Sequence, residues 1–294
     1  MSNETLVSRK YKKVSRIREV IHRLSKNKGA MISLAFLLIL ILAAVFADVY
    51  LDYDTDVIGI NASQKMQAPS AAHIFGTDQY GRDIFFRVIY GARYSLSVGF
   101  VAVMIALTLG VILGAIAGYF GGNLDNLIMR CLDVFNAVPM ILLGVVIVSA
   151  LGPSTLNLML AIGLASVPGF ARITRAAVLT TCNQEYVQAA RSIGMSEFRI
   201  IFAHVLPNCL SPIIVQATMK IAGAVVNAST LSFLGMGVPT PAPEWGTMLS
   251  EGRNFIRGYG YMTLYPGLAI VLVVMAFNIL GDGIRDAMDP KLKR

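Results

Sequence analysis

Long uncharged runs of apolar residues make up most of the chain, and short polar stretches separate them. One such run covers residues 29–47, and a longer one covers residues 94–120. A helix needs about 20 consecutive apolar residues to cross roughly 30 Å of hydrocarbon. Both runs therefore predict membrane-spanning helices, the first of them over residues 29–49.

The rest of the chain continues this pattern. The apolar run over residues 134–170 is too long for one crossing, and the Gly-Pro-Ser turn at 152–154 divides it into a third and a fourth helix. The third begins earlier, near Asn126, and the fifth and sixth cover residues 210–234 and 262–281. The pattern predicts an all-α polytopic membrane protein with six transmembrane helices and both ends of the chain on one side.

Composition agrees with this fold class. Hydrophobic residues make up 55% of the chain and charged residues 14%, and the mean hydropathy is +0.65. A soluble domain typically carries about 25% charged residues. With several spans, 294 residues leave no room for a large soluble domain.

Lysine and arginine are distributed unevenly among the predicted loops. Loops rich in these residues stay in the cytoplasm, and here they concentrate in the two tails and in the loop before the fifth span. We therefore expect a basic cytoplasmic tail over 1–28, an extracytoplasmic segment over 50–93, a five-helix core over 94–285 with a cytoplasmic loop at 172–209, and a cytoplasmic tail over 286–294. Basic cytoplasmic flanks account for the net charge of +8 without nucleic-acid binding.

Residue types that carry chemistry are scarce. The three cysteines and three histidines are scattered, without metal-ligand spacing, and no set of nucleophile and base marks a catalytic site. The chain has no GxxxxGK(S/T) loop that would bind the phosphates of ATP. A secondary transporter would need carboxylates inside the spans, where only Asp133 and Asp282 occur, near span ends. We expect a protein that is not an enzyme, with no metal site and no cofactor of its own.

The polar segment over residues 185–207 stands between two apolar spans and looks like a docking element. Residues 185–193 favour a helix that places Val187, Ala190 and Ile193 near one face. The first helix should therefore be amphipathic.

A bend and a second short helix should follow. Gly194 suits a left-handed helix end, Ser196 is a candidate N-cap for the second helix, and Pro207 should limit how far that helix continues. The small Ala189 and Ala190 would let a partner surface come close, and Arg191 would pair with a carboxylate on that surface.

The spacing of small residues in this segment resembles the EAA loop of binding-protein-dependent ABC importers. Ala189-Ala190, Gly194 and Leu206-Pro207 match, whereas Gln188 and His204 replace the family's usual acid and aliphatic residue. The resemblance implies a coupling loop that engages ATPase subunits. Its candidate ATPase-coupling residues are Glu185, Tyr186, Gln188, Ala189, Ala190, Arg191, Gly194, Ser196, Leu206 and Pro207. An amphipathic loop lying on the membrane surface is the alternative.

Four other stretches, in the same order along the chain, resemble the permeases of dipeptide, oligopeptide and nickel importers. They are Gly76-Thr77-Asp78 with Gly81-Arg82-Asp83, residues 118–122 with Asp125, Arg130, Asp133 and Pro139, residues 231–235 with Trp245-Gly246 and Met248-Leu249, and Gly281-Asp282-Gly283 with Asp289-Pro290. The first and third are typical of the C-type subunit, the second of the two permeases in such importers.

The resemblance implies a type I permease fold in a bacterial or archaeal cytoplasmic membrane. It also implies four kinds of partner: a homologous permease, two cytosolic ATPase subunits that bind ATP and Mg²⁺, an extracytoplasmic solute-binding protein, and membrane lipid. The implied cargo is a dipeptide or oligopeptide, and a nickel chelate or another small solute is the alternative. Residues 48–75 would face the solute-binding protein or form a plain solvated loop.

Several residues inside the spans have a structural or a pathway interpretation. Gly110, Gly114 and Gly118 are four apart and favour close helix packing, and Arg130 and Asp133 are three apart and predict an ion pair. Candidates for the translocation pathway are Asn136, Asn157, Gln216, Lys220 and Asn227.

Lys220 is the unusual member of this set, because it interrupts the fifth apolar span. A charge within a span costs about 2.5–3.5 kcal/mol, so Lys220 should face water, protein or headgroups. It either meets a peptide carboxylate in the pathway, or snorkels or pairs within the transporter.

Overall fold

The structure is a computed structural model that describes residues 16–289, so the outer parts of both predicted tails lie outside the described residues. Within 16–289 the chain is helical, without strands and with one isolated bridge between Thr77 and Asp83. Five helices are long and apolar enough to cross a membrane. They are α2 (Lys28–Val45), α4 (Ile84–Phe120), α7 (Thr155–Cys182), the continuous segment Glu197–Phe233 that contains α10 (Leu206–Phe233), and α12 (Tyr261–Met288).

Shorter elements connect or flank these five helices. The α-helices among them are α1 (Arg16–Leu24), α3 (Ala47–Tyr50), α5 (Gly122–Ala137), α6 (Met140–Leu151), α8 (Glu185–Ser192), α9 (Glu197–Ile200) and α11 (Trp245–Gly252). The others are η1 (Tyr53–Val57), η2 (Ala62–Gln64), η3 (Ile201–Val205) and η4 (Arg253–Phe255).

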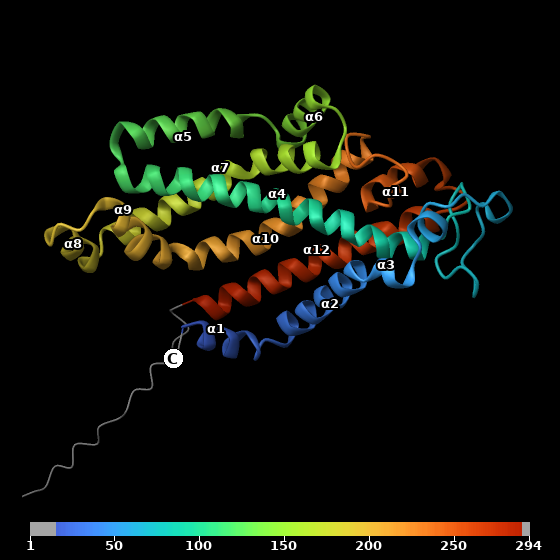
Figure 1. Ribbon diagram of the computed structural model, residues 1–294, viewed down its shortest axis with the longest axis horizontal. Helices are drawn as coiled ribbons and strands as arrows, with labels where there is room; N and C mark the ends of the chain where they lie inside the picture. Colours follow the sequence, from blue (N-terminus) through green and yellow to red (C-terminus); the bar gives the residue numbers. More distant parts are fainter. Residues whose placement is uncertain (1–15, 290–294) are drawn as a thin grey trace, which may run out of the picture.

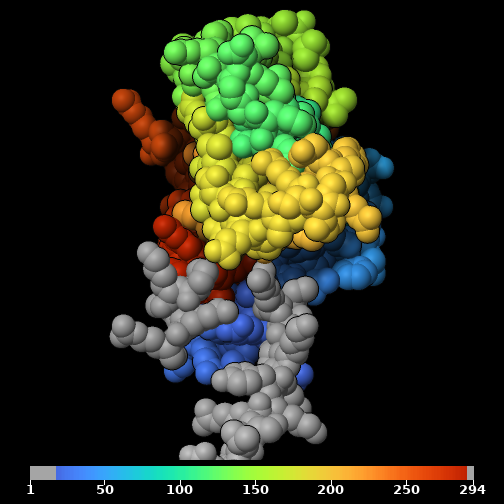
Figure 2. Space-filling view, turned by 90° about the vertical axis from the view of Figure 1, so that its left-hand side faces the viewer, coloured from blue at the N-terminus to red at the C-terminus, as the bar shows by residue number. Residues whose placement is uncertain are grey.

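The long helices lie side by side along one direction (Figure 1). At one end of the bundle lie α1, the last turns of α12, and α8 with α9; α3 and α11 lie at the other end (Figure 1). Figure 2 views the first end, where α8 and α9 (yellow) stand in front and α5 (green) lies above them. The two ends of the described chain and the α8–α9 segment therefore share one end of the bundle.

The second long helix packs closely along α7 through glycines. A Cβ atom on Gly110 would lie 2.4 Å from Phe170 Cβ, and one on Gly114 would lie 2.3 Å from the carbonyl oxygen of Ala171. These separations are shorter than any van der Waals contact, so only glycine lets the two backbones approach this closely.

That helix, α4, begins at Ile84, earlier than the predicted start at residue 94. The Asp83 side chain caps it by accepting hydrogen bonds from the backbone N–H groups of Phe85 (2.8 Å) and Phe86 (3.3 Å). Arg87 and Arg93 interrupt the apolar pattern in the first turns, and both are ion-paired. Because these two residues are charged, the length of the apolar run did not reveal the first part of the helix.

The predicted third span is not one straight helix. It consists of α5 and α6, which meet at a bend of 88°. Val138 is extended and Pro139 follows it, because proline restricts the preceding residue to extended backbone and lacks the N–H that would continue the helix. Residues 16–289 therefore contain five helices that could cross a membrane, or six such spans if this bent pair counts as one.

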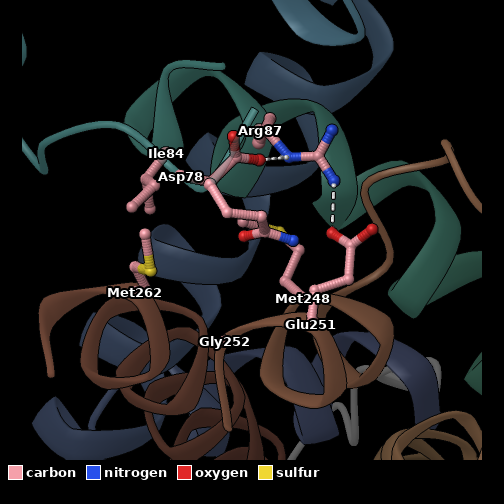
Figure 3. A pocket seen from close by; sticks show the side chains of 8 residues that line it. Asp78, Ile84, Arg87, Met248, Glu251, Gly252 and Met262 are labelled. Atoms are coloured by element: carbon pink, nitrogen blue, oxygen red, sulfur yellow. Dashed lines mark hydrogen bonds and ion pairs between the residues drawn. The ribbon is translucent and has the colours of Figure 1, made fainter. Parts of the chain in front are cut away.

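A buried charge cluster lies at the α11 end of the bundle. It consists of Asp78, Arg82, Arg87 and Glu251, of which Figure 3 shows Asp78, Arg87 and Glu251. Arg82 Nε lies 2.6 Å from Asp78 Oδ2, and Arg82 Nη2 lies 2.9 Å from Glu251 Oε2. Arg87, which is 1% exposed, lies 3.3 Å from Glu251 and 3.7 Å from Asp78. Two cations and two anions leave the cluster neutral.

Arg87 also binds backbone that is distant in sequence. Its Nη1 donates to the carbonyl oxygens of Val57 (3.0 Å) and Pro241 (3.3 Å). One side chain thus joins η1, the segment before α11, and the start of α4. The predicted extracytoplasmic segment and the loop before α11 are held on the helical bundle by this arginine.

We expect Arg87→Met to lower the free energy of unfolding by about 3–5 kcal/mol, because the substitution leaves Arg82 as the one cation between two carboxylates and so leaves one negative charge of the cluster uncompensated. Chemical unfolding of the purified chain in detergent measures this. Arg93→Met is the matched control, since Arg93 pairs with Asp48 at a partly exposed site and should matter much less. Equal losses in the two variants would contradict the role of the cluster.

Candidate functional site

The segment between α7 and α10 forms two short helices around a bend. Gly194, at φ +75°, ends α8. Its N–H donates to the carbonyl of Arg191 (2.9 Å), and the N–H of Met195 donates to that of Ala190 (3.2 Å). This pair of bonds is the Schellman arrangement, which requires a left-handed residue at this position. The bend expected at Gly194 is therefore present.

The α8 helix rests on the bundle through one face. Val187 is fully buried and Ala190 is 5% exposed, and they pack in a cluster with Val178, Val205 and Cys209. Ala190 therefore contacts the chain itself and not a partner, whereas Ala189 is exposed. The predicted placement of Ile193 on the packed face is wrong.

Large apolar side chains project from the opposite side of this segment. Ile193 is 77% exposed, Phe198 73% and Phe202 56%. The rings of Phe198 and Phe202 lie 4.6 Å apart, between centroids. Sequence reasoning missed these two aromatic residues, although their spacing of four on a helix was the available signal. Together with Tyr186, which is 43% exposed, they form what we call the apolar docking surface.

Arg191 and Glu197 connect the two short helices to α4. Arg191 lies over the ring of Tyr119, 5.0 Å from its centroid, and 3.9 Å from the Glu197 carboxylate. The Tyr119 hydroxyl donates to the same carboxylate. The side-chain hydrogen bond between Arg191 and Tyr119 raises the pKa of the Arg191 guanidinium above its ordinary value. The predicted partner of Arg191 was a carboxylate on another subunit, but here the carboxylate belongs to the same chain.

Two further details of the predicted segment differ from expectation. Ser196 precedes α9, but its side chain makes no capping hydrogen bond. Pro207 does not limit the second helix, because the helical segment runs unbroken from Glu197 to Phe233. The π-turn of η3 precedes the proline and shifts the backbone hydrogen bonds, so that Leu206 N–H donates to Ile201 and Pro207 falls in the first turn of α10, where proline is tolerated. Glu185 and Gln188 are exposed on α8.

The five polar residues proposed for the pathway do not form one group. Gln216 and Lys220 line the same groove on α10, and Asn136 is exposed at the end of α5. The Asn157 side chain donates to the carbonyls of Leu151 and Gly152 and so fixes the α6–α7 turn. Asn227 approaches Met140 Sδ (3.3 Å) between α10 and α6.

Two ion pairs join α5 to α7. Arg172 Nη2 lies 2.8 Å from Asp133 Oδ1, and Arg175 donates two hydrogen bonds to Asp125, of 2.5 and 2.6 Å. The predicted pair of Arg130 with Asp133 does not form, because Asp133 pairs across to α7. Sequence spacing within one helix could not reveal a partner on a neighbouring helix.

Comparison with known proteins agrees with this arrangement. The sequence profile described as "Binding-protein-dependent transport system inner membrane component" matches residues 110–294. A second profile, described as "N-terminal TM domain of oligopeptide transport permease C", matches residues 15–69. Of the buried charge cluster, Glu251 lies within the first match, and Asp78, Arg82 and Arg87 lie between the two matches.

Curated relatives match almost the whole chain. The dipeptide transport system permease protein DppC of Alkalihalophilus pseudofirmus is 48% identical over 283 residues, which cover 96% of this chain and 92% of the relative. The di/tripeptide transport system permease protein DppC of Pseudomonas aeruginosa is 43% identical, with 95% and 93% covered. The glutathione transport system permease protein GsiD of Pectobacterium atrosepticum is 40% identical, with 94% and 91% covered.

Among solved structures, the MetNI methionine ABC transporter in an inward-facing conformation has a similar fold. The TM-score is 0.59 at 17% identity, over 70% of this chain and 98% of the other. This likeness concerns the fold alone, and the relatives above carry the assignment. The chain belongs to the family of binding-protein-dependent transport system inner membrane components, as a permease subunit of a bacterial ABC importer.

Proposed function

We propose that this chain is one of two homologous permease subunits that import dipeptides or oligopeptides across the cytoplasmic membrane. The observation that carries the proposal is the apolar docking surface at one end of a bundle of membrane-spanning helices. Soluble proteins seldom leave several large apolar side chains exposed together, and such patches mark sites of protein contact. The partners at this surface would be two ATPase subunits, which supply ATP and Mg²⁺ binding.

The end of the bundle that carries the apolar docking surface would face the cytoplasm. This end contains five lysine or arginine residues: Arg191 and Arg199 on the α8–α9 segment, Arg285 on α12, Lys26 before α2 and Lys28 at its start. Loops and flanks rich in lysine and arginine remain cytoplasmic. The opposite end, with the buried charge cluster, would then face the extracytoplasmic solute-binding protein, and both ends of the chain would be cytoplasmic.

Coupling would follow from the continuity of the helices. The segment from Glu197 to Phe233 has no break, so a displacement of α9 at the ATPase moves α10 and its pathway residues with it. The contacts of Arg191 and Glu197 with Tyr119 carry the same displacement to α4. Closure of the ATPase dimer would thus tilt α4 and α10 together and alternate the access of the pathway.

Peptides are the cargo that the relatives favour. The three relatives described above are named for dipeptides, di/tripeptides and glutathione, and glutathione is itself a tripeptide. A nickel chelate is the weaker candidate, because the unpaired Lys220 in the pathway would repel a cationic complex. A secondary transporter has no support, since carboxylates are scarce in the spans.

We expect Phe198→Ser to reduce the recovery of ATPase subunits with this chain at least about tenfold, because exposed aromatic residues dominate binding energy at interfaces. Copurification of the tagged chain from membranes measures this. Ile74→Ser is the matched control: Ile74 is 56% exposed at the other end of the molecule and should leave recovery unchanged. Normal recovery with Phe198→Ser would argue against docking here.

We expect Gly194→Val to lower peptide uptake at least about tenfold while ATP hydrolysis continues. A β-branched residue is strained at φ +75°, and no atom lies within 4 Å of a Cβ there, so the effect is on the bend and not on packing. Gly194→Asn should retain uptake, because asparagine tolerates the left-handed conformation. Uptake and hydrolysis are measured together in proteoliposomes, and normal uptake with Gly194→Val would refute coupling through this bend.

A further inference from the structure

A groove of about 420 Å³ runs between α10 and α12. It is lined by Gln216, Met219, Lys220, Ala222, Gly223, Val226, Val274 and Asn278. The side of α10 that packs on α4 carries Ile221 and Val225, which lie against Gly99. Positions 216, 220 and 223 fall on the opposite side of a helix with 3.6 residues per turn. The groove therefore opens away from α4.

Lys220 lies near the middle of α10, about 20 Å from either end at a rise of 1.5 Å per residue. It is exposed, and a Cβ on Gly169 of α7 would lie 3.9 Å from its Cε. Lys220 is therefore about equally distant from the two ends of the helix.

Lys220 makes no ion pair within residues 16–289. Asp282, one turn beyond Asn278 on α12, does not reach it. The neighbouring cation Arg172 is paired with Asp133. Lys220 is thus a charge at mid-depth without a partner among the described residues, and such residues mark substrate or ion pathways.

The groups around Lys220 suit a carboxylate. An ammonium donates up to three hydrogen bonds, and an amide side chain donates two. Gln216 and Asn278 each present an amide to the groove, and neither forms a hydrogen bond to another described residue. An ammonium flanked by two amide donors from two helices can hold both oxygens of one carboxylate.

We propose that Lys220, with Gln216 and Asn278, binds the C-terminal carboxylate of the peptide during its passage. This inference rests on the proposed function and adds a chemical requirement to it: the permease itself prefers cargo with a free carboxylate. The carboxylate of the peptide would compensate the charge of Lys220 while the peptide is in the groove. Gly223 lines the groove close to Lys220, and no atom lies within 4 Å of a Cβ built there, so that a peptide backbone can lie against α10.

The test compares uptake of two peptides of identical sequence, one with a free carboxylate and one with a C-terminal amide. The assembled transporter in proteoliposomes is supplied with each peptide at a concentration that saturates the binding protein. We expect the wild-type chain to import the free acid faster. In Lys220→Met that preference should fall at least about tenfold, the range of a charge-assisted hydrogen bond, and Lys220→Arg should keep it.

Three outcomes would count against the inference. An unchanged preference in Lys220→Met shows that the carboxylate is not bound here. A loss of assembled complex in Lys220→Met, with a normal preference in what remains, shows that Lys220 instead pairs with a carboxylate of the second permease. Failure of the wild-type complex to import either peptide would overturn the proposed function as well, and so is distinguished from the other two.

Discussion

The ion pairs of Arg82 and Arg87 with Asp78 and Glu251 are the interaction on which the rest of the structure depends. A buried arginine is tolerated only where its charge is compensated and its donors are satisfied. Here compensation comes from Asp78, which precedes α4, and from Glu251, which is distant in sequence and lies on α11. The cluster fixes the α11 end of the bundle and leaves the other end free to move.

The two ends of the molecule have opposite physical character as a consequence. At the α11 end, charges are buried and paired, and Arg87 also binds two backbone carbonyls. At the α8 end, large apolar side chains are exposed, and the segment is held on the bundle by the apolar packing of Val187, Ala190 and Ile200 and by the contacts of Arg191 and Glu197. The helices α4 and α10 connect these ends without a break. A displacement of the α8 segment would therefore be transmitted along both helices toward the α11 end.

Apolar run length was enough to predict most of the long helices, because only helices satisfy their own backbone hydrogen bonds in lipid. Run length gave the wrong bounds where charged residues or a proline lie within a helical segment. The ion-paired Arg87 and Arg93 interrupt the apolar pattern in the first turns of α4. Pro139 divides the predicted third span into α5 and α6. Pro207 was expected to limit the second helix, but the π-turn of η3 accommodates it and the helix continues. In the α8 segment, Gly194 was predicted from local conformation, but the exposure of Ile193 depended on tertiary contacts that no local pattern specifies.

The most direct measurement is uptake of a radiolabelled dipeptide by proteoliposomes that contain the complete complex, with ATP enclosed on the side of the ATPase subunits and the binding protein outside. We expect accumulation that requires both ATP hydrolysis and the binding protein. It should disappear when this chain is omitted. Accumulation driven by a proton or sodium gradient without ATP would contradict the function proposed for this chain.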